Sequence, residues 1–315
     1  MPVRVQAYLD NWYAWVVDEV DNAGNIANFV FRGNAAYLHN FLQGGIGNDT
    51  ITGIASHNRI HGFAGNDSII GTVSGYNALY GDQGNDTITG GINADCIYGG
   101  QGNDLLEGRG GNDVITGGVG IDTIYGGDGD DIIEDDGSDG LVHGGNGNDD
   151  INVELSNGLI YGDDGNDQIT VRRPRTALPP SPRRGVIVQD GNGDDVVNVR
   201  SSHIQIESDR GADLYQVNDK SYIKISYHNY YDSTTTHSDT ITGFDGRLDD
   251  KIDLWPLTFS GLDHLQFAID TRQSGNVVLR FTGDGSSALH VNCGDDHILR
   301  VLFRDSHVTR NDIVF

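Results

Sequence analysis

Aspartate is the residue in this sequence whose spacing indicates chemistry, because it recurs at a fixed interval between Gly44 and Thr170. In residues 44–52, and again in residues 99–107, the aspartate is the sixth of nine residues and follows closely spaced glycines. Carboxylates that recur in register can hold a hard cation such as Ca2+ between them. The spacing therefore predicts a row of metal sites, provided that the fold places the carboxylates side by side.

The aspartates belong to a unit of the form Gly-Gly-x-Gly-x-Asp-x-Ile-x, which occurs 14 times from Gly44 to Thr170 with one extra residue near Tyr76. Self-similarity at a fixed period predicts a solenoid. Glycines at the first, second and fourth positions allow a tight turn, and the polar neighbours of the eighth position predict a very short strand. Two consecutive units would form one 18-residue coil, and the strands of alternate units would form two parallel sheets.

The eighth position predicts the buried row, because a branched aliphatic residue occupies it in every unit. These residues are Ile51, Ile60, Ile69, Leu79, Ile88, Ile97, Leu106, Ile115, Ile124, Ile133, Val142, Ile151, Ile160 and Ile169. One such residue in nine makes a thin core, since each contributes roughly 2 kcal/mol against about 1–2 kcal/mol of conformational entropy for every ordered residue. The sequence therefore predicts a fold that requires bound metal.

Two columns of carboxylates follow from the 18-residue coil, one along each edge. The first edge has Asp49, Asp67, Asp86, Asp104 and Asp122, followed by Gly140 and Gly158. The second edge has Asn58 and Asn77, then Asp95, Asp113, Asp131, Asp149 and Asp167, and Asp195 after an insertion of ten residues. Equivalent carboxylates would lie about 5 Å apart and repel by roughly 3 kcal/mol at an effective dielectric constant near 20. A dication between them would turn that repulsion into a cross-link.

Backbone carbonyls of the turns would complete each coordination shell. The turn glycines that we assign to the sites are Gly45, Gly47, Gly65, Gly84, Gly100, Gly102, Gly111, Gly118, Gly120, Gly127, Gly129, Gly145, Gly147 and Gly165. Oxygen ligands in a flexible turn favour Ca2+ over Mg2+, and the lack of a recurring Cys or His in the unit excludes zinc sites. We expect about eight calcium ions.

The nonapeptide resembles the calcium-binding repeat of RTX (repeats-in-toxin) secreted proteins. The resemblance covers roughly residues 44–315 and implies an all-β fold, a parallel β-roll in which each sixth-position aspartate bridges two ions. Residues 238–254 resemble the segment that closes the rolls of serralysin-type proteases and alginate epimerase modules. Residues 311–315, in which Asn-Asp precedes three apolar residues, look like the uncleaved signal of type I secretion substrates. This resemblance implies secretion to the extracellular space by the type I route of Gram-negative bacteria.

Three regions are expected: an N-terminal cap (1–43), a β-roll (44–216, with an insertion loop at 172–184), and a C-terminal capping and secretion-signal region (217–315). A solenoid needs a cap over its open end, although the aromatic residues Trp12, Tyr13 and Trp15 leave a carbohydrate-stacking platform as an alternative. Proline is excluded from sheet interiors, so the Arg/Pro-rich loop is expected to be an exposed insertion. Docking of an anionic glycan or lipid headgroup, and a protease-sensitive site, are its alternatives.

Composition narrows the classes of function. The chain has 46 acidic and 20 basic residues, a net charge of -26 that excludes a nucleic-acid partner. No apolar run reaches the ~18 residues of a membrane span, and residues 1–8 lack the apolar core of a secretory signal. The two cysteines, Cys96 and Cys293, cannot build a disulfide framework.

No catalytic motif is apparent: neither H-E-x-x-H nor G-x-S-x-G occurs, and coordination or solvation explains the acids Glu134, Asp135 and Asp136 better than acid–base catalysis. We therefore expect no enzymatic activity. The expected function is a secreted calcium-binding protein with a structural or adhesive role at the cell surface or in the extracellular matrix, which folds on calcium after export. Its partners would be a type I exporter and a cell-surface glycan or anionic polysaccharide. A membrane-acting or pore-forming effector, and a polysaccharide-active exoenzyme with an unrecognised site, are the alternatives.

Overall fold

The computed structural model describes the parts of the chain that form strands and the turns between them. The described residues are 4–5, 9–10, 13–14, 17–18, 40–53, 56–137, 139–172, 185–200, 204–217, 223–227, 240–242, 251–253, 276–281, 287–292 and 301–302. The chain divides into two compact units, Met1–Val153 and Glu154–Phe315, which we call the first and second units. Most of the expected cap, loop residues 173–184 and residues 311–315 lie outside the described residues.

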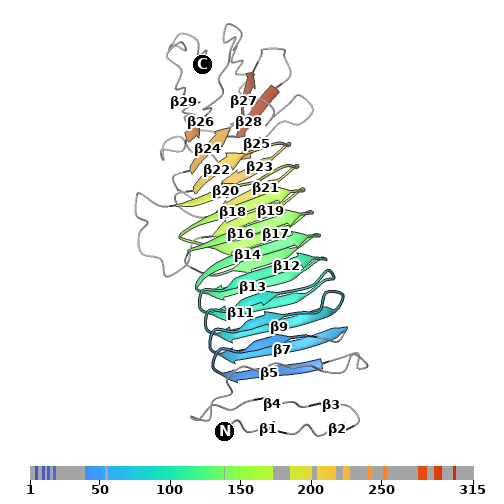
Figure 1. Ribbon diagram of the computed structural model, residues 1–315. Coiled ribbons are helices and arrows are strands. Elements are labelled where there is room, and N and C mark those ends of the chain that lie inside the picture. Colours follow the sequence, from blue (N-terminus) through green and yellow to red (C-terminus); the bar gives the residue numbers. More distant parts are fainter. Residues whose placement is uncertain are drawn as a thin grey trace. The chain divides into compact units, whose positions relative to one another are not determined.

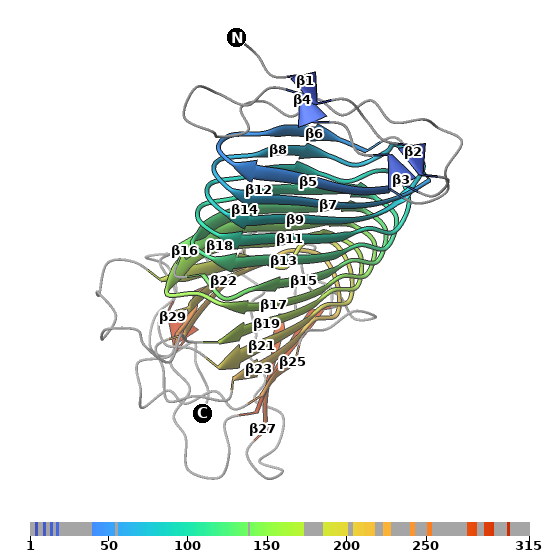
Figure 2. The ribbon, with the colours of Figure 1, turned by 90° about the horizontal axis from the view of Figure 1, so that it is seen from below.

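Two parallel sheets build the first unit, and strands that follow one another in the chain alternate between them (Figure 1). One sheet contains β6 (Thr50–Thr52), β8 (Ser68–Ile70), β10 (Thr87–Thr89), β12 (Leu105–Gly110), β14 (Ile121–Asp128) and β16 (Asp139–Asn146), in that order. The other contains β5 (Asn40–Ile46), β7 (His57–Ala64), β9 (Tyr76–Gln83), β11 (Cys96–Gln101), β13 (Val114–Val119), β15 (Ile132–Asp135) and β17 (Asp150–Glu154). Figure 2 shows β5, β7, β9 and β11 side by side. The all-β, two-sheet parallel fold that the sequence predicts is confirmed.

Short antiparallel pairs precede these sheets in the chain. β1 (Arg4–Val5) pairs with β4 (Val17–Asp18), and β2 (Leu9–Asp10) pairs with β3 (Tyr13–Ala14). Among the described residues no helix is long and apolar enough to span a membrane. Cys96, the cysteine within the described ranges, is a half-buried free thiol. The capping role of residues 1–43 stays a prediction.

The register of the sheets follows the repeat. Leu106 pairs with Ile124, two repeat units further along the chain, and the same spacing recurs along both sheets of the first unit. One coil is longer by a single residue, since Ile60 pairs with Leu79. The extra residue falls in the turn of residues 71–75, between β8 and β9. The 18-residue coil and the position of the extra residue are thus as predicted.

The strands are longer than the sequence predicts, because pairing continues into the glycine-rich half of the repeat. β9 and β14 each have eight residues, and Gly100 pairs with Gly118 in register. The second position of the unit has a left-handed backbone even where it is not glycine. The residues concerned are Phe63, Asp82, Arg109 and Asp163, with φ between 71 and 80°. The turn half therefore belongs to the sheet ladder as well.

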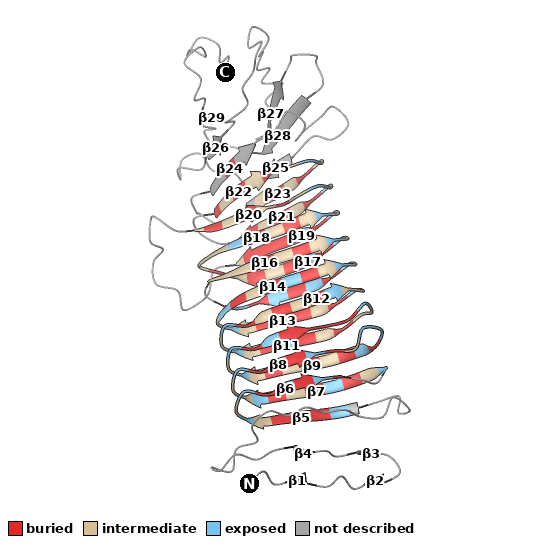
Figure 3. Cartoon of the chain, viewed as in Figure 1, coloured by how far each residue is buried: buried red, intermediate tan, exposed pale blue. Residues whose placement is uncertain are grey.

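The core is a double row of aliphatic side chains, and Figure 3 shows that buried segments recur on the stacked strands. Every side chain predicted at the eighth position, from Ile51 to Ile169, is 0% exposed. Each coil of the first unit thus buries two large side chains, one from each sheet, between layers of glycine and aspartate. This confirms the predicted row and its thinness in that unit.

The second unit has the same alternation of strands between two sheets, parallel except for the antiparallel pair β27–β28, and a denser core. One sheet contains β18 (Asn157–Asp164), β20 (Val186–Gln189), β22 (Ile204–Ser208), β24 (Ile223–Tyr227), β26 (Lys251–Asp253) and β29 (Val301–Leu302). The other contains β19 (Gln168–Arg172), β21 (Val196–Arg200), β23 (Leu214–Val217), β25 (Thr240–Thr242), β28 (Ser287–Asn292) and β27 (Asn276–Phe281). Here single strands bury two aliphatic residues, as in Val186 with Val188 and Ile204 with Ile206. The second unit therefore gains more from apolar burial than the nonapeptide pattern suggests.

Alanine substitutions at two glycines, Gly102 and Gly110, test how closely the turns pack. Gly102 has φ +129°, and a Cβ there would overlap the carbonyl oxygen of Gly84, so Gly102→Ala should destabilise the fold by more than about 3 kcal/mol. A Cβ on Gly110 would meet its nearest atom at 3.7 Å, so Gly110→Ala should stay within about 0.5 kcal/mol of the parent. Thermal midpoints at saturating calcium compare the two variants. Equal midpoints would contradict the stacking of the turns.

Candidate metal centre

The sixth-position aspartates of the first edge form a buried column in the first unit. Asp49, Asp67, Asp86, Asp104 and Asp122 are all at most 3% exposed. The backbone N–H of each of the first four donates to Oδ1 of its equivalent one coil later, as from Asp86 to Asp104 at 2.7 Å and from Asp104 to Asp122 at 2.8 Å. The carboxylates therefore meet at one edge, in the turns that precede β6, β8, β10 and β12 and at the start of β14, as the repeat predicts.

On both edges, several column carboxylates have a second oxygen that is buried without a hydrogen bond. Buried, unpartnered Oδ2 atoms belong to Asp67, Asp86, Asp104, Asp113, Asp131 and Asp195. Burying an ionised carboxylate without a partner costs several kcal/mol. A row of such oxygens, all of one chemical type, fits a hard cation that prefers oxygen ligands.

Because glycine has no side chain, the first and fourth positions leave room for the aspartate carboxylates and for the carbonyl oxygens of neighbouring turns. A Cβ on Gly99 would contact Oδ2 of Asp104 and would lie 2.6 Å from the carbonyl oxygen of Gly117. At the fourth position, a Cβ on Gly129 would overlap the carbonyl oxygen of Gly111, one coil earlier. Carbonyl oxygens therefore stack beside the carboxylates and can supply further ligands.

Twelve of the 14 glycines that we assign to the sites have a left-handed backbone, and Gly45 and Gly120 do not. The twelve are Gly47, Gly65, Gly84, Gly100, Gly102, Gly111, Gly118, Gly127, Gly129, Gly145, Gly147 and Gly165. The nine at the fourth position lie in the turns along the two edges, whereas the five at the second position lie near the ends of strands. The binding of metal by each carbonyl stays a prediction.

The second edge begins with amides. The Nδ2 of Asn58 donates to Oδ1 of Asn77 at 2.7 Å, and Nδ2 of Asn77 donates to Oδ1 of Asp95 at 2.9 Å. An amide carries its own donor, so these two positions bind one another without a cation. The carboxylate column therefore starts at Asp95, as the sequence predicts.

From Asp95 onward the second edge repeats the geometry of the first. Asp95 N donates to Asp113, Asp113 N to Asp131 and Asp131 N to Asp149, at 2.7, 2.7 and 2.8 Å. In the second unit, Asp167 N donates to Asp195 Oδ1 at 2.7 Å, although 28 residues separate them in sequence. The insertion of ten residues therefore leaves the register of the second column intact within that unit.

Four stretches of the chain, residues 43–73, 74–106, 107–134 and 143–171, match the family of the RTX calcium-binding nonapeptide repeat. The repeat region is an RTX calcium-binding array. All ten aspartates of the two columns up to Asp167 lie in the matched stretches. The match does not reach residues 238–254, whose resemblance to a serralysin-type closing segment stays a prediction. Among curated proteins, no sequence matches the chain significantly.

Burial without metal raises the pKa of the RTX aspartates. Desolvation raises the pKa of Asp104 to about 7, with a further contribution from the charges of Asp122 and Asp86. It raises the pKa of Asp113 to about 8, again with a contribution from the neighbouring carboxylates. In both cases the hydrogen bond from a backbone N–H lowers the pKa, but by less. Without a cation, Asp104 and Asp113 therefore take up protons near neutral pH, and a bound cation would displace those protons.

The stability of the calcium-free protein should consequently depend on pH. The folded pKa values, about 7 for Asp104 and about 8 for Asp113, exceed the ordinary value of 3.8, so the folded state binds more protons than the unfolded state. Stability without calcium should fall as the pH rises from about 4 to about 8. Circular dichroism of dialysed, metal-free protein should show more β structure at pH 5.5 than at pH 8. More β structure at pH 8 would contradict the assignment of these carboxylates as buried.

The first column ends by a change of residue type. Asp122 pairs in register with Gly140. In the second unit, Gly158 pairs with Val186, and Val186 with Ile204, so the equivalent position becomes an apolar one. Isoleucine and valine thus take the space of a carboxylate where the RTX motif lapses. The sequence predicts the loss of the aspartate, but the aliphatic replacement lies outside the nonapeptide pattern.

Asp135 is a buried acid that the motif does not include. It stands at the first position of its unit, normally glycine, and is 2% exposed with a buried, unpartnered Oδ2. A Cβ on Gly117 would lie 2.7 Å from Asp135 Oδ1 and 2.8 Å from Asp122 Oδ2, so both carboxyl groups face the same place. Burial, with a contribution from Asp122, raises the pKa of Asp135 to about 7. Asp135 therefore brings a second carboxylate to the end of the first column.

Asparagine at the fifth position forms a further ladder. Oδ1 of Asn48 accepts from Asn66 N at 2.8 Å, Asn66 Oδ1 from Asn85 N at 2.9 Å, and Asn85 Oδ1 from Asn103 N at 2.8 Å. These amides are exposed, and they join consecutive RTX turns beside the metal column. Their recurrence in the sequence was the available signal, although the nonapeptide template treats the fifth position as variable.

Proposed function

We propose that the chain is a secreted RTX protein with a structural or adhesive role at the cell surface or in the extracellular matrix, and that it folds on calcium after export. The observation that carries the proposal is the row of buried, unpartnered carboxylate oxygens along each edge. About eight calcium ions would complete these columns. The proposal includes no enzymatic activity, so the calcium acts by neutralising charge and cross-linking turns.

Coupling of folding to calcium supports an extracellular location. Without metal the columns bury ionised or protonated acids at a cost, so the array gains its stability from metal binding. Calcium is scarce in the cytosol and abundant outside the cell, which favours export of an unfolded chain. The type I route of Gram-negative bacteria, with its exporter as the partner, fits this order of events.

An aromatic row on the first unit supports an adhesive role. His61, Tyr80 and Tyr98 are paired in register on β7, β9 and β11, and their rings stack at 4.3 and 4.9 Å between centroids. Phe41 and Phe63 flank the row and are each 41% exposed. Stacking covers the ring faces within the row, so the ring edges and the exposed rings of Phe41 and Phe63 supply the apolar area that a sugar ring could contact. The repeat along the sheet suits a polymer with regularly spaced residues.

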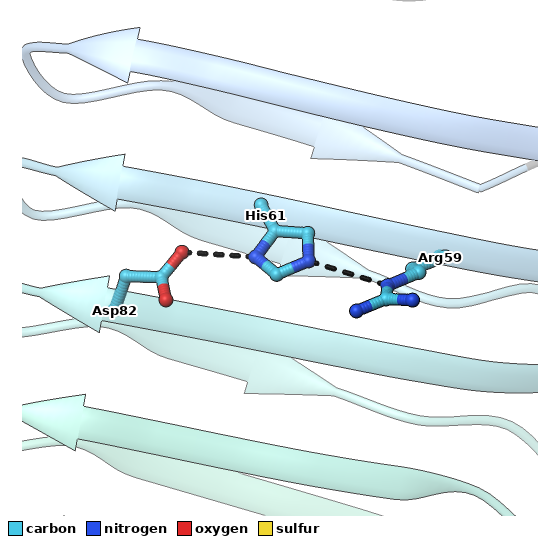
Figure 4. A network of polar contacts seen from close by, with 3 residues as sticks. All are labelled: Arg59, His61 and Asp82. Atoms are coloured by element: carbon cyan, nitrogen blue, oxygen red, sulfur yellow. Dashed lines mark hydrogen bonds and ion pairs between the residues drawn. The ribbon is translucent and has the colours of Figure 1, made fainter.

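Two charged side chains, Arg59 and Asp82, contact the His61 ring of this row (Figure 4). Arg59 Nε donates to His61 Nε2 at 3.4 Å, so the ring proton lies on Nδ1 and faces Asp82 Oδ2 at 3.1 Å. The Arg59 guanidinium lies 5.4 Å from the centre of the Tyr80 ring. Arginine recognises carboxylates through paired hydrogen bonds. A cell-surface glycan or an anionic polysaccharide therefore fits this face as a ligand.

A glycan array, with the protein in calcium and in excess chelator, tests the proposed function. We expect calcium-dependent binding that the double variant Tyr80→Ala/Tyr98→Ala weakens by about tenfold, at roughly 0.5–1.5 kcal/mol for each aromatic contact. Tyr125→Ala is the matched control, because Tyr125 lies on β14 in the other sheet. Equal loss in the control, or full binding by the double variant, would refute the adhesive face.

A further inference from the structure

The first position of the repeat faces the interior, and its occupant changes along the chain. It is glycine in most turns of the columns and valine at Val153, Val171 and Val199, all three of which are 0% exposed. In the second unit, Asp190 occupies this position and is also 0% exposed. A carboxylate thus stands, as at Asp135, where most units have an apolar side chain or none.

The contacts of Asp190 hold its carboxylate in place. Oδ1 accepts from Gly191 N and Asp209 N, each at 3.0 Å, and Oδ2 accepts from the hydroxyl of Tyr215 at 2.5 Å. Tyr215 is fully buried on β23, at an eighth position that is aliphatic in the 14 regular units. Its hydroxyl also lies 3.3 Å from Oδ2 of Asp213. One hydroxyl proton therefore faces two carboxylates.

Asp195 brings a third carboxylate to the same place. Ligand oxygens of Asp190, Asp195 and Asp213 all lie within 4.8 Å of one another, and the three residues are buried. Asp195 is 1% exposed, and its Oδ2 has no hydrogen-bond partner. Three carboxylates at such distances repel strongly in a buried setting. The unpartnered oxygen of Asp195 indicates that a cation completes the group.

We propose that Asp190, Asp195 and Asp213 form a cation site distinct from the two-carboxylate sites of the RTX columns. The third carboxylate comes from outside the RTX ligand pattern, and Tyr215 orients it. Because affinity rises with the number of charged ligands, this site binds Ca2+ more tightly than the column sites and accepts trivalent lanthanide ions. It joins the turn between β20 and β21 to the turn that precedes β23 in the next coil. The proposal rests on the calcium-dependent function given above.

Terbium luminescence tests the site directly, because Tyr215 lies against two of the ligands and can transfer excitation energy to a bound Tb3+. In the full-length protein, the first equivalent of Tb3+ should give tyrosine-sensitised emission, and Tyr215→Phe should remove most of it while calcium still folds the chain. Asp190→Asn should weaken binding of the first Tb3+ by at least about tenfold. The matched control is Asp194→Asn, because Asp194 is exposed and its Oδ1 accepts from Ala212 N, which asparagine can also do.

Asp190→Asn and Asp194→Asn remove the same charge, so equal Tb3+ affinities in the two variants would overturn the proposal. If circular dichroism at saturating calcium shows that Asp190→Asn does not fold, Tyr215→Phe decides: unchanged first-equivalent emission would overturn the site, and its loss would support it. Parent protein that binds no calcium would instead refute the proposed function. Calcium binding in the parent together with no effect of Asp190→Asn would refute this inference alone.

Discussion

Removing calcium from the purified protein should convert its circular dichroism spectrum from β structure to coil. The structure gives the reason in the first unit, where each coil buries two aliphatic side chains and two turns of glycine and aspartate. Asp86 and Asp104 are at most 3% exposed, and each has an unpartnered oxygen. Loss of the cation leaves these charges buried and uncompensated, which costs several kcal/mol for each.

Circular dichroism during a titration from excess chelator into millimolar Ca2+ measures this transition at pH 8. Magnesium serves as the control ion, and it should fail to restore β structure because it demands a tighter octahedral shell. The same β spectrum in chelator and in calcium would show that the array folds by apolar burial alone.

Asp104→Asn and Asp131→Asn should each raise the calcium concentration at the folding midpoint by about tenfold or more, since a charged ligand in the middle of a column is lost. Each of these carboxylates accepts a backbone N–H from one neighbour, while its own N–H donates to the next. Asparagine keeps the accepting oxygen, so the variants change the charge more than the hydrogen-bond ladder.

Asp139→Asn is the matched control for these two variants. Asp139 is half-buried and pairs with Ile121, in a unit that has Gly140 at the sixth position. Its midpoint should therefore stay within about twofold of the parent. Calcium titrations followed by circular dichroism compare the three variants, and the same midpoint for Asp131→Asn and Asp139→Asn would show that the assigned columns are wrong.

The fold of the array was predictable because two kinds of residue recur in the sequence with the same period as the coil. The aliphatic eighth position and the sixth-position aspartate both recur every nine residues, and a parallel coil is the arrangement that stacks both. The register from Leu106 to Ile124 and the change at Gly140 follow directly. Strand length was not predictable from that pattern, since glycines that read as turn residues also pair along the sheets.

The main features that could not be predicted from the sequence are buried residues outside the repeat motif. Asp135 and Asp190 each replace a first-position glycine, and a single aspartate in an acidic chain gives no signal of burial. Val186 and Ile204 continue the first edge as apolar residues, but an insertion and an irregular unit separate them from the regular repeats. In each case the position in the coil, rather than the residue type, determines the environment.

Within residues 44–200, both interruptions of the 18-residue period fall where an edge has no carboxylate. The extra residue lies in turn 71–75, just before Asn77, and the ten-residue insertion follows Arg172 and precedes Val186. A calcium column constrains the number of residues in each turn, because two turns that share an ion must both bring their ligands to it. Turns that contribute no carboxylate can lengthen without loss of a ligand. They are the permissive positions at which evolution, or an engineer, can graft a new peptide onto the array.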